Sequence, residues 1–119
     1  MDKTMVIGVS QSPARYANLA VSSLLEHGYQ VVALGRQAFV FKGVEVMSGM
    51  PAITGIHTVT LYINPFLQQA YYQYILNLKP KRIIFNPGTE NPEFQKIAES
   101  AGILVQEDCT LVLLSTAQY

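Results

Sequence analysis

Residues 8–13, with the sequence GVSQSP, separate an apolar run at residues 5–7 from a segment whose apolar residues recur at helical spacing. A glycine at the end of a strand allows a sharp turn and lets a ligand come close to the backbone. The free N–H groups of the first helical turn, with the positive end of the helix dipole, favour an anion. This junction therefore predicts a turn, beginning at Gly8, that binds an anion such as phosphate.

The turn departs from the glycine-rich dinucleotide fingerprint, because Ser10 stands where a second glycine would be and Pro13 where a third would be. Pro13 suits the first position of a helix, and Ser12 suits its N-cap. Ser10 adds a hydroxyl donor, and Arg15 and Asn18 fall on the first two helical turns, within reach of a bound phosphate. We predict that these residues bind the phosphate. A purely structural turn with a solvated Arg15 is the alternative that this segment leaves open.

The end of the second predicted strand carries an arginine where NAD-binding domains usually carry an acid. That stretch reads Ala33-Leu34-Gly35-Arg36-Gln37, about twenty residues after the glycine turn, where a carboxylate would bind the ribose hydroxyls. A guanidinium there suits a phosphorylated ribose, such as that of NADP or coenzyme A. An Arg36 that simply points into water is the alternative.

Chain length distinguishes these two ligands. A dehydrogenase usually has a second domain that holds its substrate against the nicotinamide, and 119 residues suit one domain. Binding of coenzyme A is the simpler inference, and a small NADP-using oxidoreductase completed by a dimer partner is the alternative.

Three segments have helical spacing of their apolar residues. They begin at Pro13, near Pro65 and at Pro92, and the first and third end at Gly28 and Gly102. Strand-like runs cover residues 4–7, 30–34, 57–63, 81–85 and 103–106, with a short edge strand at 44–46 in a segment that is otherwise loop. The apolar tail at 109–114 fits a strand or a short helix. We predict a Rossmann-like doubly wound α/β sheet of about five parallel strands, in three αβα layers, over a single domain at residues 1–119.

Turn-forming and polar residues follow the later strands as well as the first. Ligands of such sheets bind beyond the carboxyl ends of the strands, near the point where strand order reverses. We therefore expect one cleft to be lined by the first turn together with Gly35, Arg36, Asn64, Pro65, Asn86, Pro87 and Gly88.

The charge balance disfavours a nucleic-acid partner. The chain has eight basic and eight acidic residues without a basic cluster, whereas binding to a phosphate backbone relies on clustered positive charge. No apolar stretch approaches the ~18 residues of a membrane span, and no secretory leader is evident. The single Cys109 excludes an intrachain disulfide and agrees with a reducing compartment. We expect a cytoplasmic protein that binds neither nucleic acid nor membrane.

The candidate catalytic residues favour structural roles. His27 lies at the end of a helix. His57 begins a strand, at the opposite end of the sheet's strands from the predicted cleft. Acidic neighbours such as Asp108 would keep the Cys109 thiol neutral, so we expect a buried, unreactive cysteine. Glu90 is expected to be a solvated carboxylate near a helix start. Two isolated histidines and one cysteine make no metal site.

Three tyrosines fall on the second predicted helix. Tyr71 and Tyr74 share its apolar face, whereas Tyr72 is expected to point outward. An exposed tyrosine could belong to a subunit contact, so a homodimer stays open.

Several short motifs in the same order resemble the small CoA-binding domain proteins, which are relatives of the nucleotide-binding domain of succinyl-CoA synthetase α subunits. The motifs are GVSQSPARYAN at 8–18, HGYQV at 27–31, NP at 64–65, NPG at 86–88, AGI at 101–103 and EDC at 107–109. The resemblance runs nearly end to end.

The resemblance implies a Rossmann-like fold that binds coenzyme A or an acyl-CoA, with phosphates near Gly8, Ser10 and Arg15 and the adenosine over the loop after the second strand. It implies no ligase chemistry, because the phosphorylated histidine of the synthetases belongs to a later domain, and we expect a protein without catalytic activity of its own. The chain has Gly35-Arg36 where the family often has Asn-Pro. Either Arg36 compensates by pairing with a phosphate, or the affinity for coenzyme A is lost. A further alternative is that the chain is an interaction module with a vestigial nucleotide pocket.

Overall fold

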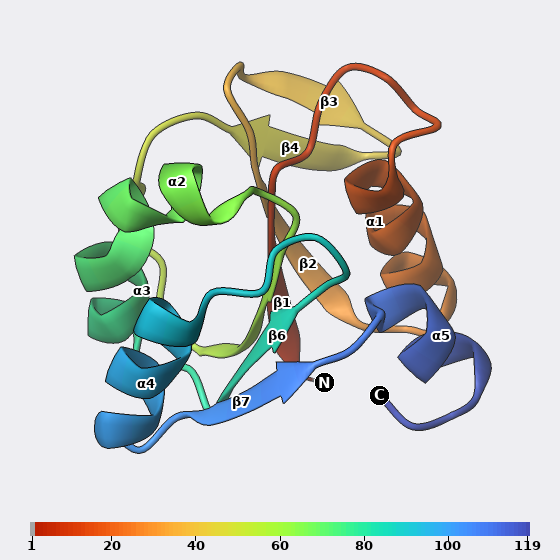
Figure 1. The fold of residues 1–119 in the computed structure, drawn as a ribbon. Helices are drawn as coiled ribbons and strands as arrows, with labels where there is room; N and C mark the ends of the chain where they lie inside the picture. The colour runs from red at the N-terminus through yellow and green to blue at the C-terminus, as the bar shows by residue number, and fades with distance from the viewer. Residues whose placement is uncertain (1) are drawn as a thin grey trace.

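Seven strands form one sheet in the computed structural model, which describes residues 2–119 (Figure 1). The order from edge to edge is β3 (Phe39–Phe41), β4 (Val44–Met47), β2 (Gln30–Leu34), β1 (Lys3–Ile7), β5 (Ile56–Leu61), β6 (Arg82–Phe85) and β7 (Leu104–Glu107). All neighbouring pairs are parallel except β3 and β4, which are antiparallel. The chain proceeds from β1 to one side through β2 and then returns to the other side at β5. Strand order therefore reverses between β1 and β5.

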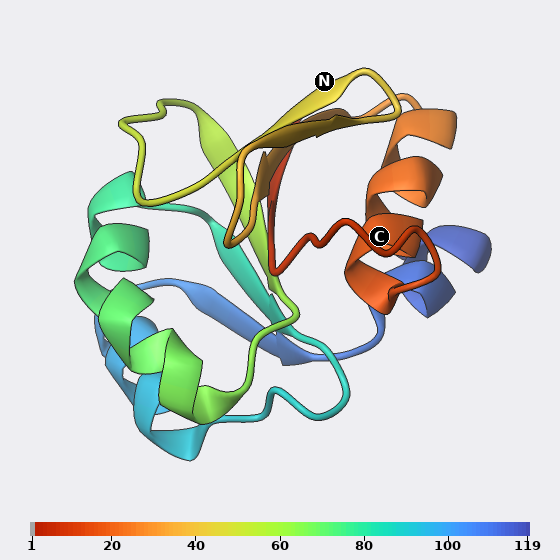
Figure 2. The ribbon, with the colours of Figure 1, turned by 90° about the horizontal axis from the view of Figure 1, so that it is seen from above.

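Helices cover both faces of this sheet (Figures 1 and 2). Helices α1 (Tyr16–Glu26) and α5 (Thr110–Ser115) pack on one face. The other face is covered by α2 (Pro65–Gln68), the 3₁₀ turn η1 (Gln69–Tyr71), α3 (Tyr72–Leu78) and α4 (Pro92–Ser100). This is the predicted three-layer α/β architecture, which is confirmed.

Alternation along the strands divides the core into two parts, because successive side chains of a strand point to opposite faces. In β1, Met5 and Ile7 pack toward α3 and α4, whereas Val6 packs toward α1. Helix α1 contributes Ala17 and Val21 to the second core, four residues apart on one face. The β1–β5 ladder places the carboxyl ends of these two strands side by side, between the two cores.

Two predicted helix starts are confirmed. The side chain of Asn64 accepts a hydrogen bond from the Leu67 N–H at 2.9 Å, and that of Asn91 accepts one from the Phe94 N–H at 3.1 Å. Proline occupies the first position of both helices. These local signals fix where the chain leaves the sheet after β5 and β6.

The first predicted helix start is wrong by three residues. Helix α1 begins at Tyr16, and Arg15 is its N-cap without a side-chain cap. Ser12 and Pro13 instead lie in a preceding turn, in which the Arg15 N–H donates to the Ser12 carbonyl at 3.1 Å. The buried side chain of Asn18 holds the Ser10 backbone and so fixes the path of this turn.

Three further expectations need correction: the number of strands, the second helix and the direction of Tyr72. Seven strands replace about five, because the predicted loop at 35–55 contains the hairpin β3–β4, and β3 is the edge strand. The second predicted helix is divided into α2, η1 and α3. The tail, which fits a strand or a short helix in the sequence, forms the helix α5. Tyr72 does not point outward, since its ring stacks on Phe94 at 4.3 Å between centroids.

Among residues 2–119, no helix has the length and hydrophobicity that a membrane crossing requires.

Candidate functional site

A cavity of about 820 Å³ lies at the carboxyl ends of β1 and β5, where strand order reverses. This is where doubly wound sheets bind their ligands, and the volume falls within the usual range of ligand pockets. We call the residues from the β1–β2 side the near wall: Ile7, Gly8, Val9, Ser10, Gln11, Arg15, Tyr16, Ala17, Gly35, Arg36, Gln37 and Phe39. The residues from the β5–β6 side form the far wall: Tyr62, Ile63, Asn64, Leu67, Tyr71, Pro87, Gly88 and Thr89.

Two glycines allow the backbones to meet at the base of the cavity. Gly8 has φ +114°, and a Cβ there would lie 3.1 Å from the carbonyl oxygen of Tyr62. A Cβ at Gly35 would lie 2.1 Å from the carbonyl oxygen of Val9. Both positions therefore require glycine. At Gly8 the positive φ and the nearby backbone both disfavour a side chain, and at Gly35 a Cβ would clash with the backbone of Val9.

The backbone donors of the first turn fall into two groups. The N–H groups of Gly8 and Val9 both donate to the Leu34 carbonyl, at 2.9 and 3.0 Å, and so are already used. In contrast, the N–H groups of Gln11, Tyr16 and Ala17 have no acceptor within residues 2–119. These three residues line the cavity. Donors for an anion therefore come from Gln11 and from the first turn of α1 rather than from the glycine itself.

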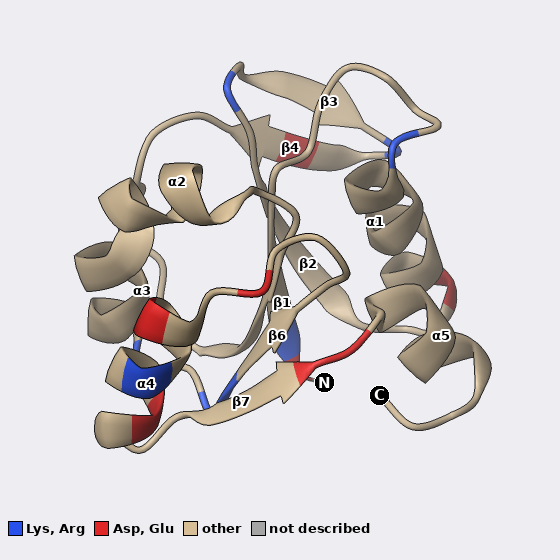
Figure 3. Cartoon of the chain, in the orientation of Figure 1, with Lys and Arg blue, Asp and Glu red and all other residues tan. Residues whose placement is uncertain are grey.

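Arg15 and Arg36 are the two charged residues of the near wall. No Asp, Glu, Lys or His belongs to either wall among the residues that the structure describes. Five of the eight acidic residues lie between positions 90 and 108, on α4, β7 and the loops beside them (Figure 3). The cavity of a chain with zero net charge is therefore lined by positive charge only, which favours an anionic ligand.

Asn18, predicted to contact phosphate, lies outside both walls and holds the first turn from behind. It is fully buried; its Oδ1 accepts the Ser10 N–H at 3.2 Å, and its Nδ2 donates to the Ser10 carbonyl at 2.7 Å. The Ser10 Oγ in turn accepts the Ser12 N–H at 3.1 Å and keeps its own proton for a ligand. Asn18 is therefore a positioning residue for Ser10.

We predict that Asn18→Ala lowers the free energy of unfolding by about 1–3 kcal/mol, because it leaves two partly buried backbone groups of Ser10 without their partners. Urea denaturation checks this loss. Asn77→Ala, at an exposed position of α3, is the control and should change stability little. Equal effects of the two substitutions would show that Asn18 does not hold the turn.

The structure brings eight of the predicted site residues together around the cavity: Gly8, Ser10, Arg15, Gly35, Arg36, Asn64, Pro87 and Gly88. Five predicted residues lie elsewhere: Ser12, Pro13, Asn18, Pro65 and Asn86. Ser12 and Pro13 turn away with the delayed start of α1, and Pro65 opens α2.

Asn86 is buried and all its side-chain groups are used within the fold. Its Nδ2 donates to the Thr60 Oγ1 at 2.7 Å and to the Leu61 carbonyl at 2.8 Å, and its Oδ1 accepts the Thr110 N–H at 2.9 Å. Asn86 therefore ties β6, β5 and α5 together and has no group left for a ligand.

Sequence reasoning missed most apolar and aromatic parts of the walls, including Tyr16, Phe39, Tyr62, Leu67 and Tyr71. Tyr62 could have been found, because it directly follows the strand that ends at the reversal of strand order. Phe39 ends the loop that the sequence predicts at the cleft after the second strand, but only Gly35 and Arg36 of that loop are predicted site residues. Tyr16, Leu67 and Tyr71 had no comparable signal.

The Tyr62 hydroxyl is buried and has no hydrogen-bond partner among residues 2–119. Burial raises its pKa to about 12 from 10.0, although the neighbouring Thr110 hydroxyl acts in the opposite direction. The ring packs against the α1–α5 core. We assign Tyr62 a structural role at the base of the far wall, because a hydroxyl with this pKa stays protonated near neutral pH.

This pKa predicts an alkaline loss of stability. Below pH 10 the Tyr62 hydroxyl is protonated in both the folded and the unfolded chain, so its contribution to stability does not change with pH. As pH rises from 10 to 12, the unfolded chain loses the proton first, so stability falls by up to about 1.4 kcal/mol per pH unit. Urea unfolding from pH 8 to 11 should show a shallower fall for Tyr62→Phe. If the free energy of unfolding falls equally steeply with pH in the unsubstituted chain and in Tyr62→Phe, the raised pKa of Tyr62 is contradicted.

None of the other candidate catalytic residues lines the cavity. His27 caps α1, with its Nδ1 2.7 Å from the Ser23 carbonyl, and His57 lies near Asp2 at the amino ends of the strands. Cys109 is half-buried at the start of α5, rather than fully buried as expected. The Glu90 carboxylate accepts the Gly88 N–H at 2.9 Å and so shapes the far wall. Within residues 2–119, no group of three His, Cys, Asp or Glu side chains could hold a metal ion.

The comparison with protein families gives one match over nearly the whole chain. A family profile described as a CoA binding domain matches residues 2–115. No curated protein matches the sequence.

Solved structures share the fold. One crystal structure, of a protein described as uncharacterized, is 45% identical with a TM-score of 0.96, and the match covers 100% of this chain and 98% of that one. A Thermus thermophilus structure is 24% identical with a TM-score of 0.86, over 99% of this chain and 90% of that one. A dinucleotide-forming acetyl-coenzyme A synthetase from Candidatus Korarchaeum cryptofilum, solved with phosphate and ADP, is 15% identical with a TM-score of 0.72. That match covers 90% of this chain and 25% of the synthetase chain.

Proposed function

Because this chain belongs to the CoA-binding domain family, we propose that its cavity binds coenzyme A, free or as an acyl-CoA, and catalyses no reaction on it. The observation that carries the proposal is the positive lining: Arg15 and Arg36 are the charged residues of the two walls described above. Coenzyme A carries a pyrophosphate and a 3′-phosphate, so it offers anionic groups to both arginines. Paired N–H bonds from a guanidinium suit such groups.

The near wall supplies the donors for the phosphates. The unpaired N–H groups of Tyr16 and Ala17 lie at the amino end of α1, where the helix dipole also favours an anion, and that of Gln11 lies in the turn before the helix. The Ser10 hydroxyl adds a donor, and Arg15 follows it at the N-cap. In the proposed complex this group holds the pyrophosphate, and Arg36, at the end of β2, pairs with the phosphate on the ribose.

Binding without catalysis fits the chemistry of the walls. General acid–base and nucleophilic catalysis rely mostly on His, Asp, Glu, Cys and Lys, and the walls formed by the described residues include none of these. Tyr62 stays protonated, because burial raises its pKa to about 12. Coenzyme A itself would supply the thiol that carries an acyl group.

Thermal unfolding with added ligands tests the proposal. We expect coenzyme A to raise Tm by several degrees, because a ligand at 100 times its Kd stabilises the native state by about 2.7 kcal/mol. NAD, which lacks a phosphate on its ribose 2′-hydroxyl, should produce a smaller shift. No shift with millimolar coenzyme A would reject the proposed ligand.

NADP is the second candidate, because Arg36 stands where a 2′-phosphate would be recognised. A clear shift with NADP and none with coenzyme A would support an NADP-binding protein. A stable oligomer that responds to neither nucleotide would indicate an interaction module with a vestigial pocket.

A further inference from the structure

The far wall is built from two loops that are separate in sequence. One, at residues 62–64, connects β5 to α2, and the other, at residues 86–91, connects β6 to α4. No backbone hydrogen bond joins these two loops in residues 2–119. The β5–β6 ladder ends just before them, at Leu61 and Phe85, so beyond the ladder only side chains can hold the two loops together.

The amide of Gln68 joins the two loops. This side chain is fully buried, and its Nε2 donates to the Ile63 carbonyl at 2.9 Å and to the Thr89 carbonyl at 2.8 Å. Its Oε1 accepts a hydrogen bond from Asn91 Nδ2 at 2.9 Å. Both amide protons of Gln68 are thus used to hold a far-wall residue of each loop.

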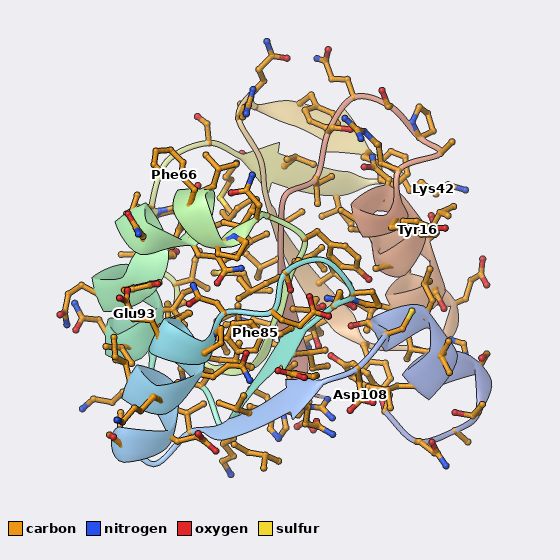
Figure 4. The ribbon with its side chains drawn as sticks, viewed as in Figure 1. Tyr16, Lys42, Phe66, Phe85, Glu93 and Asp108 are labelled. Carbon is orange, nitrogen blue, oxygen red and sulfur yellow. The ribbon has the colours of Figure 1, made fainter. Side chains whose placement is uncertain are left out.

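Asn91 holds Gln68 in this orientation. Its Nδ2 donates to Gln68 and, at 2.8 Å, to the Tyr72 hydroxyl, while its Oδ1 caps α4. The Tyr72 hydroxyl donates onward to Glu93, which lies at the start of α4 beside α3 (Figure 4). Because the network is fully hydrogen-bonded and largely buried, it favours one arrangement of the two loops.

We infer that Gln68, which does not line the cavity, is a positioning residue for the part of the ligand that the far wall binds. The inference rests on the proposed function. The far wall carries no charged side chain. Its Gly88 and Thr89 N–H groups and its Thr89 carbonyl are used within the fold, so it offers a ligand the Asn64 Nδ2, the Pro87 and Gly88 carbonyls and the side chains of Leu67 and Tyr71. The pantetheine arm of coenzyme A, with two amides, a thiol and no charge, fits this wall, whereas the phosphates fit the near wall.

The test compares coenzyme A with adenosine 3′,5′-bisphosphate, which lacks the pantetheine arm. In Gln68→Met, a side chain of similar length without hydrogen-bonding groups leaves the Ile63 and Thr89 carbonyls unpaired. We expect calorimetry to show about tenfold weaker binding of coenzyme A, equivalent to 1.4 kcal/mol, and less than about twofold change for the bisphosphate. Gln69→Met, the same substitution at the exposed neighbouring position, should change neither Kd.

The outcomes separate the inference from the proposed function. Unchanged coenzyme A binding by Gln68→Met, or an equal loss for both ligands, overturns the positioning role but leaves coenzyme A as the ligand. No binding of coenzyme A to the unsubstituted chain overturns the proposed function and this inference with it. A loss restricted to coenzyme A supports both.

A second variant covers the case in which Gln68→Met does not fold. Asn91→Asp keeps the oxygen that caps α4 but removes the donor to Gln68. We expect the same selective loss for coenzyme A, and equal affinities in this variant and the unsubstituted chain would overturn the inference.

Discussion

Replacing Gly35 with alanine is expected to destabilise the protein by about 3 kcal/mol and to abolish ligand binding. The added Cβ would lie 2.1 Å from the Val9 carbonyl oxygen, which is backbone and cannot rotate away. Either β2 or the first turn must move, and overpacking of this kind costs about 1–3 kcal/mol or occasionally more. Urea denaturation measures the stability, and calorimetry with coenzyme A measures the binding.

The control for this substitution is Gly43→Ala, in the β3–β4 turn. A Cβ there meets no atom within 4 Å, although the glycine has φ +78°. We expect a cost of about 1 kcal/mol, from backbone strain alone, and no effect on binding. If Gly35→Ala is tolerated as well as Gly43→Ala, the contact between Gly35 and Val9 does not shape the cavity.

Removing both cavity charges, with Arg15→Gln and Arg36→Gln, is expected to weaken coenzyme A binding by about 100-fold. Each arginine is exposed and lines the near wall, so each should contribute about 1.4 kcal/mol, at the low end for hydrogen bonds to charged groups. Stability should change little, because neither arginine forms an ion pair among residues 2–119. The affinity of the unsubstituted chain should also fall as salt is added, because salt screens exposed charges.

Lys42→Gln provides the matched control. Lys42 is an exposed cation in the β3–β4 turn (Figure 4) and lies outside the cavity walls. Its loss changes the net charge as each arginine substitution does and should leave Kd within about twofold, because long-range attraction between exposed charges is screened. A similar loss of affinity in the single variants Arg15→Gln, Arg36→Gln and Lys42→Gln would indicate a general charge effect rather than two specific contacts.

The single substitutions also distinguish the roles of the two arginines. If Arg36 pairs with the phosphate on the ribose, Arg36→Gln should weaken coenzyme A more than dephospho-coenzyme A, which lacks that phosphate. Arg15→Gln should weaken both ligands equally. Isothermal calorimetry with the two ligands checks this difference, and equal losses for Arg36→Gln would remove Arg36 from the ribose phosphate.

Local signals made much of the fold predictable. The chain order of β1, α1 and β2 follows from apolar periodicity, and the starts of α2 and α4 follow from Asn64 and Asn91, each with proline after it. The family profile over residues 2–115 confirms the resemblance that the motifs indicated. Such signals act within a few residues along the chain, so they can be recognised without knowledge of distant neighbours.

The hairpin β3–β4 shows where local signals are insufficient. The alternation Val44-Glu45-Val46 predicts the short strand that becomes β4. In contrast, β3 has only three residues, all apolar, and no alternation that would mark it as a strand. β4 becomes part of the sheet because it pairs with the exposed side of β2, through Ala33 and Leu34. Partners of this kind are defined only in the folded chain.

The sequence alone determined the fold class, the edge of the sheet that carries the candidate site and the arginines near it, because periodicity, caps and turn residues are local. Only the tertiary structure decided which polar side chains face the cavity. Asn18 and Asn86 look equally suited to a ligand in the sequence, yet both are buried, and Asn86 bonds to groups 24 to 26 residues away. Gln68 gave no signal at all, because its role arises from two loops that meet only when the sheet forms.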